Sequence, residues 1–129
     1  MIGLDSDCII DFLKGKEEAK KLISLQREEI VTTEINVYEI FLGILSKKEV
    51  SEKERLMARL FFESIGILGS GNWCEKSAET VCGLIKKGKT IEQNDVLIGS
   101  ILKANGCYKI MSRNKKHFLE IDGLEVITY

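Results

Sequence analysis

Near its start the chain reads IGLDSDCIID, residues 2–11. The short apolar run Ile2–Leu4 is typical of a buried strand, and this run stops at the carboxylate of Asp5. Residues 8–13 are apolar apart from one polar break, which indicates a helix, and Gly15 serves as its stop signal. A buried strand that runs through an acid into a helix is the first unit of an α/β fold.

The same alternation of strands and helices continues along the chain. Further strands are expected at residues 30–32, 65–68, 109–111 and 124–127. Helices are expected over residues 17–26, 34–45 with Thr33 as cap, 51–62 opened by a capping box, 73–87 with Asn72 as cap, and 94–105. Short apolar strands between helices predict an α/β domain with a mostly parallel, buried central sheet.

Size and composition indicate one compact folding unit. The 129 residues fit a single domain over residues 1–129, and a hydrophobic content of 44% can form a core without disulfides. No linker-like or repeated segment divides the chain. The formal net charge is −1, which argues against a surface covered in basic groups, so nucleic-acid binding would use a local patch.

The cysteines and the single histidine, His117, do not form a zinc-binding pattern. None of the four cysteines belongs to a C-x-x-C pair, and each has apolar neighbours, so we expect buried, reduced thiols. The start of the chain shows no basic region followed by a long apolar stretch, so no secretory signal is expected. The apolar runs elsewhere are too short to span a bilayer. These features predict a cytoplasmic protein without a membrane partner.

Three acids occupy positions where a parallel sheet collects its ligands. Asp5 ends the first strand, Glu39 lies in the helix after the second strand, and Asp95 lies in the first turn of a later helix. Glu39 and Asp95 interrupt apolar stretches, and each has a glycine four residues later, Gly43 and Gly99, that would let another element approach. We expect these acids to be partly buried and to converge.

Converging carboxylates need a cation. Two carboxylates about 4 Å apart repel by roughly 4 kcal/mol at an effective dielectric of about 20. Hard oxygen ligands without His or Cys select Mg²⁺ or Mn²⁺ over zinc. A cation held by a few carboxylates keeps water that can be activated against a phosphodiester, so the pattern predicts metal-assisted hydrolysis of a phosphate ester.

Each acid also has a purely structural interpretation. Asp5 could cap the helix that follows it, and Asp95 could complement a helix N-terminus. Glu39 is the hardest of the three to explain as a surface charge, although a solvated position on its helix stays open. Two nearby acids, Asp7 and Asp11, are expected to face solvent or to cap.

Five segments resemble the motifs of the PIN domain family. In chain order they are LDSDCIID at residues 4–11, TTEINVYE at 32–39, NDVLIG at 94–99, MSRNKKHF at 111–118 and DGLEV at 122–126. The resemblance covers essentially the whole chain and is closest to the VapC-type toxins of toxin–antitoxin pairs, with KKHF at 115–118 similar to archaeal members. It implies a three-layer α/β/α PIN-like domain.

The resemblance also implies a function. It implies an RNA endonuclease that holds Mg²⁺ or Mn²⁺ through Asp5, Glu39 and Asp95, forms a homodimer and is silenced by a cognate antitoxin. Many PIN domains place a fourth acid where this chain has Asn114, which puts a second metal in doubt.

The turn around Asn114 holds the candidates for substrate contact. These candidates are Ser112, Arg113, Asn114 and Lys115, of which the charged members could form a phosphate-binding rim or simply a solvated turn. His117 is expected to be a packing or surface residue rather than a catalytic base.

Other functions remain open on the sequence. A PIN-fold nuclease for RNA processing and a PIN-fold module that binds RNA or protein without cutting are the alternatives. Phosphatases of the haloacid-dehalogenase type share an Asp-x-Asp start, but this chain lacks the later acidic pair that they require. Which RNA is cut, which metal is used and whether an antitoxin exists are not encoded in any motif of the chain.

Overall fold

The computed structural model describes residues 1–89 and 92–129 of the protein. In these residues a five-stranded sheet has the order β3-β2-β1-β4-β5. The strands are β1 (Ile2–Leu4), β2 (Ile30–Thr33), β3 (Gly66–Leu68), β4 (Lys109–Met111) and β5 (Glu125–Ile127). All neighbouring strands pair in parallel, which confirms the predicted sheet and brings all five carboxyl ends to one edge.

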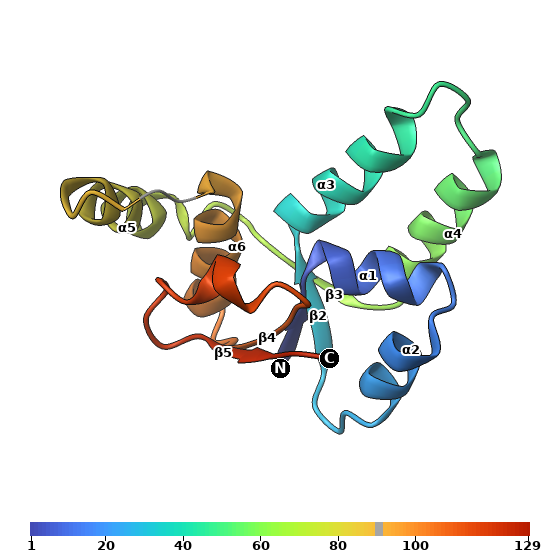
Figure 1. Ribbon diagram of the computed structural model, residues 1–129, viewed down its shortest axis with the longest axis horizontal. Coiled ribbons are helices and arrows are strands. Elements are labelled where there is room, and N and C mark those ends of the chain that lie inside the picture. Colours follow the sequence, from blue (N-terminus) through green and yellow to red (C-terminus); the bar gives the residue numbers. More distant parts are fainter. Residues whose placement is uncertain (90–91) are drawn as a thin grey trace.

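Helices connect the strands and cover both faces of the sheet (Figure 1). They are α1 (Ser6–Leu13), α2 (Glu17–Ser24), α3 (Glu34–Leu45), α4 (Glu52–Glu63), α5 (Cys74–Lys86), α6 (Gln93–Ala104) and the short 3₁₀ helix η1 (Lys115–Phe118). Figure 1 shows α1 to α4 on one side of the strands and α5 with α6 on the other. This is the expected three-layer α/β/α arrangement.

Side-chain alternation along the strands separates two hydrophobic cores. Ile2, Leu4 and Met111 pack with α1, α3 and α4, whereas Ile110 packs with α6 and η1. Gly3 lies between Ile2 and Leu4 on the α6 face, where a Cβ atom would come within 2.7 Å of Leu102 Cδ2. The sheet and α6 therefore pack closely at Gly3. This packing brings Asp5, which follows β1, near α6 and the segments around it.

Side-chain caps follow the sequence prediction at the starts of α3 and α4 but not of α5. Thr33 Oγ1 accepts a hydrogen bond from Asn36 N, and Ser51 Oγ accepts one from Glu54 N, as predicted. The predicted cap at Asn72 is wrong, because α5 begins at Cys74 without a side-chain cap. Asn72 Nδ2 instead donates to Asn105 Oδ1 at 3.3 Å.

Two expectations about burial are only half correct. Cys8 and Cys107 are buried, whereas Cys74 and Cys82 on α5 are exposed, and all four thiols are free. Gly99 lets Ile121 approach as expected, since a Cβ atom there would come within 2.6 Å of Ile121 Cδ1. Nothing lies near a Cβ atom built on Gly43, so that glycine admits no neighbour. Periodicity identifies an apolar face but not whether another element covers it.

The outer face of the α3–α4 pair is apolar and exposed. It carries large side chains that are each more than two-fifths accessible: Tyr38, Leu42, Leu45, Leu56, Met57 and Leu60. The core side of α3 holds Asn36, Ile40 and Ile44 instead. An exposed apolar stripe on each of two packed helices is a feature of surfaces that meet another chain.

The described helices are short. The longest, α5, has 13 residues, and among the described residues no helix has both the length and the hydropathy needed to cross a membrane.

Candidate functional site

Asp5 occupies the centre of the carboxyl edge of the sheet. It directly follows β1, its side chain caps α1 by accepting from Ser6 N at 2.9 Å, and the residue is only 6% exposed. Its carboxylate also accepts from Asn36 Nδ2 at 3.3 Å and from Ser112 Oγ at 2.8 Å. The capping role and the site role proposed for Asp5 therefore coexist in one side chain.

Hydrogen bonds link Asp5 to Glu39 through two polar side chains. Ser6 Oγ donates to Glu39 Oε1 at 2.8 Å, and Asn36 Nδ2 donates to Ser6 Oγ at 3.0 Å. Asn36 is fully buried, and its Oδ1 accepts from Thr33 Oγ1 at 2.7 Å. The helix α3 thus presents Asn36 and Glu39, one turn apart, toward the end of β1.

Asn36 lies in the second motif, and the sequence alone gives it no role. The signal that could have found it is an amide inside an apolar helix, one turn before an acid that was itself suspected of being buried. A buried amide needs partners for its donor and acceptor groups, and here the partners are the site residues themselves.

Asp95 joins the site from α6. It is half-buried in the first turn of that helix, and its Oδ2 lies 3.5 Å from Nδ1 of the exposed His117. Burial raises the pKa of Asp95 to about 6; His117 opposes the rise, and the negative charges of Asp5 and Glu39 add to it. The charges of both other acids therefore raise the pKa of Asp95, as expected if the three belong to one site.

Asp5 has a similarly raised pKa. Burial is the main cause of its rise to about 6, and the charge of Asp7 adds to it, while hydrogen bonds from Ser112 and Ser6 lower it. The charge of Glu39 raises it slightly more. Two carboxyls that resist ionisation at one sheet edge make a site that a cation would stabilise.

The predicted substrate residues sit on the turn after β4. Ser112 is fully buried and donates to Asp5, so its observed contact is with an acid of the site. Arg113 is exposed, but its Nε lies 3.1 Å from Asp11 Oδ2. Asn114 Nδ2 donates to Asp7 Oδ2 at 3.3 Å, and Lys115 is exposed at the start of η1.

The expectation that Asp7 and Asp11 face solvent is wrong for Asp11. Asp11 is only 2% exposed, and Asp7 is half-buried, with one carboxylate oxygen, Oδ1, buried and without a hydrogen-bond partner among the described residues. The sequence showed Asp11 as a polar break in an apolar helix. It could not show that three cationic or hydroxyl partners from elsewhere in the chain compensate its charge.

The residues fit a hard divalent cation by their chemistry. Asp5, Glu39 and Asp95 supply only oxygen ligands, and burial together with neighbouring negative charge raises the pKa of Asp5 and Asp95. Within the described residues, no group of three Asp, Glu, His or Cys side chains is close enough together to hold a metal ion as it stands. Ser6 and Asn36 stand between Asp5 and Glu39, so a cation would draw the carboxylates together or bind them through water.

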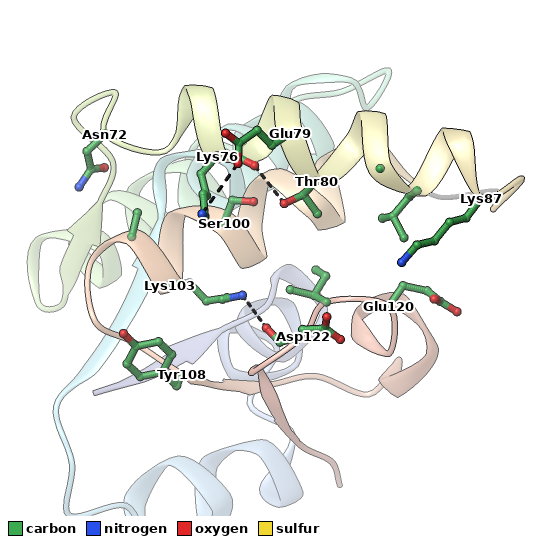
Figure 2. A pocket seen from close by; sticks show the side chains of 14 residues that line it. Asn72, Lys76, Glu79, Thr80, Lys87, Ser100, Lys103, Tyr108, Glu120 and Asp122 are labelled. Atoms are coloured by element: carbon green, nitrogen blue, oxygen red, sulfur yellow. Dashed lines mark hydrogen bonds and ion pairs between the residues drawn. The ribbon is translucent and has the colours of Figure 1, made fainter.

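A separate cavity of about 600 Å³ lies between α5, α6 and the segment before β5. Figure 2 shows lysines and acids on its walls, among them Lys76, Lys103 and Glu79. Lys103 Nζ donates to the backbone oxygen of Asp122, and Lys76 pairs with Glu79 at 3.8 Å. Its lining holds three lysines, Lys76, Lys87 and Lys103, and three acids, Glu79, Glu120 and Asp122, so the cavity lacks the excess of negative charge found around Asp5.

Comparisons with known proteins agree with the geometry. The sequence model of the PIN domain family matches residues 2–124. None of the curated proteins compared with the chain matches it.

Solved structures share the fold at low sequence identity. A chain of VapBC2 from Rickettsia felis, bound to a DNA fragment from its promoter, has a TM-score of 0.87 and 22% identity, covering 100% of this chain and 99% of that chain. A chain of DNA-bound VapBC from Salmonella typhimurium has a TM-score of 0.85 and 18% identity, covering 98% and 96%. VapC20 from Mycobacterium tuberculosis, described as a Sarcin-Ricin loop cleaving toxin, has a TM-score of 0.59 and 12% identity, covering 85% and 87%.

Proposed function

The chain belongs to the PIN domain family, and we propose that it is a metal-dependent endoribonuclease, the toxin of a VapBC-type toxin–antitoxin pair. The observation that carries the proposal is that hydrogen bonds through Ser6 and Asn36 link Asp5 to Glu39, while burial and the charge of Glu39 raise the pKa of both Asp5 and Asp95. The cleaving activity attributed to the structurally similar VapC20 supports the choice of RNA as substrate.

Each residue of the site has a part in the proposed chemistry. Mg²⁺ or Mn²⁺, when bound, would activate water and offset the charge of the phosphodiester. Asp5 and Asp95 would hold the cation with Glu39, while Ser112 and Asn36 orient the carboxylate of Asp5. Lys115 and Asn114, exposed on the same turn, would contact the phosphates of the substrate, with Arg113 and Ser112 supporting that turn.

The partners follow from the exposed surface and from the relatives. The apolar outer face of α3 and α4 suits a protein partner, so we propose a homodimer and a cognate antitoxin. The VapBC complexes that share the fold support the antitoxin. In this proposal the chain acts as one domain, residues 1–129, on RNA in the cytoplasm.

The test is RNA cleavage by purified protein with Mn²⁺, compared between wild type and Asp5→Asn. We expect wild type to cut and Asp5→Asn to lose at least about 100-fold in rate, since removing one charged ligand costs roughly 3 kcal/mol or more of transition-state stabilisation. The matched control is Glu63→Gln, an exposed acid at the end of α4, which should cut like wild type.

Three outcomes would contradict the proposal. Cleavage that persists in Asp5→Asn would point to a contaminating nuclease or to another site. A wild type that binds varied RNAs without cutting any of them would favour the binding module. Toxicity on expression that is not relieved by co-expressing a neighbouring gene, the expected source of an antitoxin, would remove the antitoxin from the proposal.

A further inference from the structure

Asp11 is a buried carboxylate that the proposed chemistry does not use. It lies on α1 and is 2% exposed, yet both of its oxygens are engaged. Oδ1 pairs with Lys16 Nζ at 3.0 Å, while Oδ2 accepts from Tyr129 Oη at 2.7 Å and pairs with Arg113 Nε at 3.1 Å. A buried charge is tolerated only with this degree of compensation, so the arrangement requires an explanation.

These contacts favour the ionised form of the Asp11 carboxylate. Burial alone would raise its pKa, but the hydrogen bonds from Tyr129 and Lys16 and the charge of Arg113 outweigh burial and lower the pKa below its usual value. Its environment is thus the opposite of that around Asp5. Asp11 already has the positive charge that the site acids lack, so it is not a candidate ligand for a further cation.

One partner of Asp11 belongs to the turn that supports the site. Arg113 lies between Ser112, which donates to Asp5 Oδ2 at 2.8 Å, and Asn114, which donates to Asp7 Oδ2 at 3.3 Å. The backbone N–H of Arg113 also donates to Asp7 Oδ2 at 3.0 Å. The turn 112–114 is therefore bound on one side by the acids at the start of α1 and on the other by Asp11.

We propose that Asp11, Arg113 and Tyr129 form a positioning triad that holds the turn 112–114 against Asp5 and thereby sets the affinity of the carboxylate site for its cation. The inference rests on the proposed function, because it concerns the same site. None of the three residues touches the substrate in this proposal. They act through Ser112, whose hydroxyl fixes one oxygen of Asp5.

Tyr129 is the part of the triad that links β5 to the site. It follows the last strand, packs against the core formed by α1, α3 and α4, and donates its hydroxyl to Asp11 Oδ2. With Tyr129 in place, Asp11 Oδ2 is held between a neutral donor and the Arg113 side chain. Without the hydroxyl, Arg113 still pairs with Asp11 Oδ2, but that oxygen loses the second partner that fixes its position.

Lys16 provides an internal control. It pairs with the other oxygen of Asp11, is about half exposed at 51%, and belongs to the loop after α1 rather than to the turn 112–114. If the role of Asp11 were purely structural, the loss of its Lys16 contact and the loss of its Tyr129 contact should affect Mn²⁺ affinity equally. A positioning role makes Tyr129 and Arg113 matter for cation binding and leaves Lys16 without influence on it.

The experiment measures Mn²⁺ affinity by calorimetry for wild type, Tyr129→Phe, Arg113→Gln and Lys16→Gln, each checked for folding by circular dichroism. Tyr129→Phe keeps the ring and its packing, so it should fold. We expect the dissociation constant to rise about 3- to 10-fold in Tyr129→Phe and Arg113→Gln, at or below the lower end of the effects of residues that orient metal ligands. In Lys16→Gln it should stay within about 2-fold of wild type.

The outcomes separate the two proposals. If wild type binds Mn²⁺ and Tyr129→Phe binds it equally well, with only a lower melting temperature, the triad is structural and the inference is wrong. If Lys16→Gln weakens binding as much as Tyr129→Phe, the inference is also wrong. If wild type neither binds Mn²⁺ nor cuts RNA, the proposed function fails and the triad falls with it.

Discussion

Asp5 and Asp95 face the same site but are held very differently. Asp5 is 6% exposed, and its carboxylate accepts hydrogen bonds from Ser6 N, Asn36 and Ser112. The side chain of Asp95 is 14% exposed, lies 3.5 Å from His117 Nδ1, and accepts no hydrogen bond from the described residues. One carboxylate is fixed before any cation arrives, whereas the other is free to adjust.

The difference follows from the elements that carry the two acids. Asp5 ends the central strand of the sheet, with α3 on one side and the turn after β4 on the other, so polar groups from three segments reach it. Asp95 sits at the start of α6, where the N-cap residue Glu92 makes no side-chain cap. A fixed ligand sets where a cation binds, and an adjustable one completes its coordination.

The largest effect we expect is the loss of cleavage on removing either acid. Asp95→Asn should reduce the RNA cleavage rate at least about 100-fold, as expected for Asp5→Asn, because in the proposed site both carboxylates hold the same cation. The double variant should lose little more than either single variant, since residues that act as a unit are not additive. Cleavage rates of the three variants under Mn²⁺ test this.

A cleavage rate close to wild type in Asp95→Asn would show that Asp95 is not part of the site. The contrast between a fixed Asp5 and an adjustable Asp95 would then no longer hold. The exposed Glu63→Gln variant controls for the general effect of removing a negative charge from the protein.

The next effect concerns the groups that fix Asp5. Asn36→Ala and Ser112→Ala should each weaken Mn²⁺ binding about 10- to 100-fold, the usual cost of removing a partner that orients a metal ligand. Calorimetric titration with Mn²⁺ measures the change, and Ser24→Ala, an exposed serine that bonds only to its own helix, is the control. Unchanged Mn²⁺ affinity in both variants would show that cation binding does not require Asn36 and Ser112 to orient the Asp5 carboxylate.

A pH series sharpens the contrast without RNA. The folded pKa of Asp5, about 6, lies above its usual value of 3.8, so its contribution to stability is present below pH 3.8 and is lost as the pH rises through 6. In EDTA, the free energy of unfolding of Asp5→Asn relative to wild type should rise by about 1–2 kcal/mol between pH 4.5 and 7. Urea unfolding at each pH gives this difference. If the difference in unfolding free energy between Asp5→Asn and wild type does not depend on pH, the pKa of Asp5 is not raised in the folded protein.

Most of the fold could be predicted from local patterns. Short apolar runs beside glycine and acid punctuation placed the five described strands, and Thr33 and Ser51 marked the starts of α3 and α4. These signals are local, since a cap or a buried strand depends on a few neighbouring residues. The cap at Asn72 failed because Asn72 bonds to Asn105, which is 33 positions away.

The sequence singled out the three acids of the proposed site but not the residues that support them. Asp5, Glu39 and Asp95 stand out because acids rarely interrupt apolar elements at strand ends without a reason. The roles of Ser112 and Arg113 depend on contacts across 107 and 102 positions, to Asp5 and Asp11 respectively. No spacing in the sequence encodes such pairs, and so Asp11 looked like a solvent-facing residue.

The smallest effect expected is that of His117, the neighbour of Asp95. His117 is 44% exposed and lies 3.5 Å from Asp95 Oδ2, a geometry in which an ion pair contributes little. His117→Gln should therefore change Mn²⁺ affinity and cleavage rate by less than about 3-fold, where Ser112→Ala changes affinity by about 10-fold or more. A loss in His117→Gln as large as in Ser112→Ala would mean that Asp95 is held as firmly as Asp5. The cation would then bind between two fixed carboxylates, and the adjustable half of the site would have to be Glu39, whose hydrogen-bond partner in the site is the hydroxyl of Ser6.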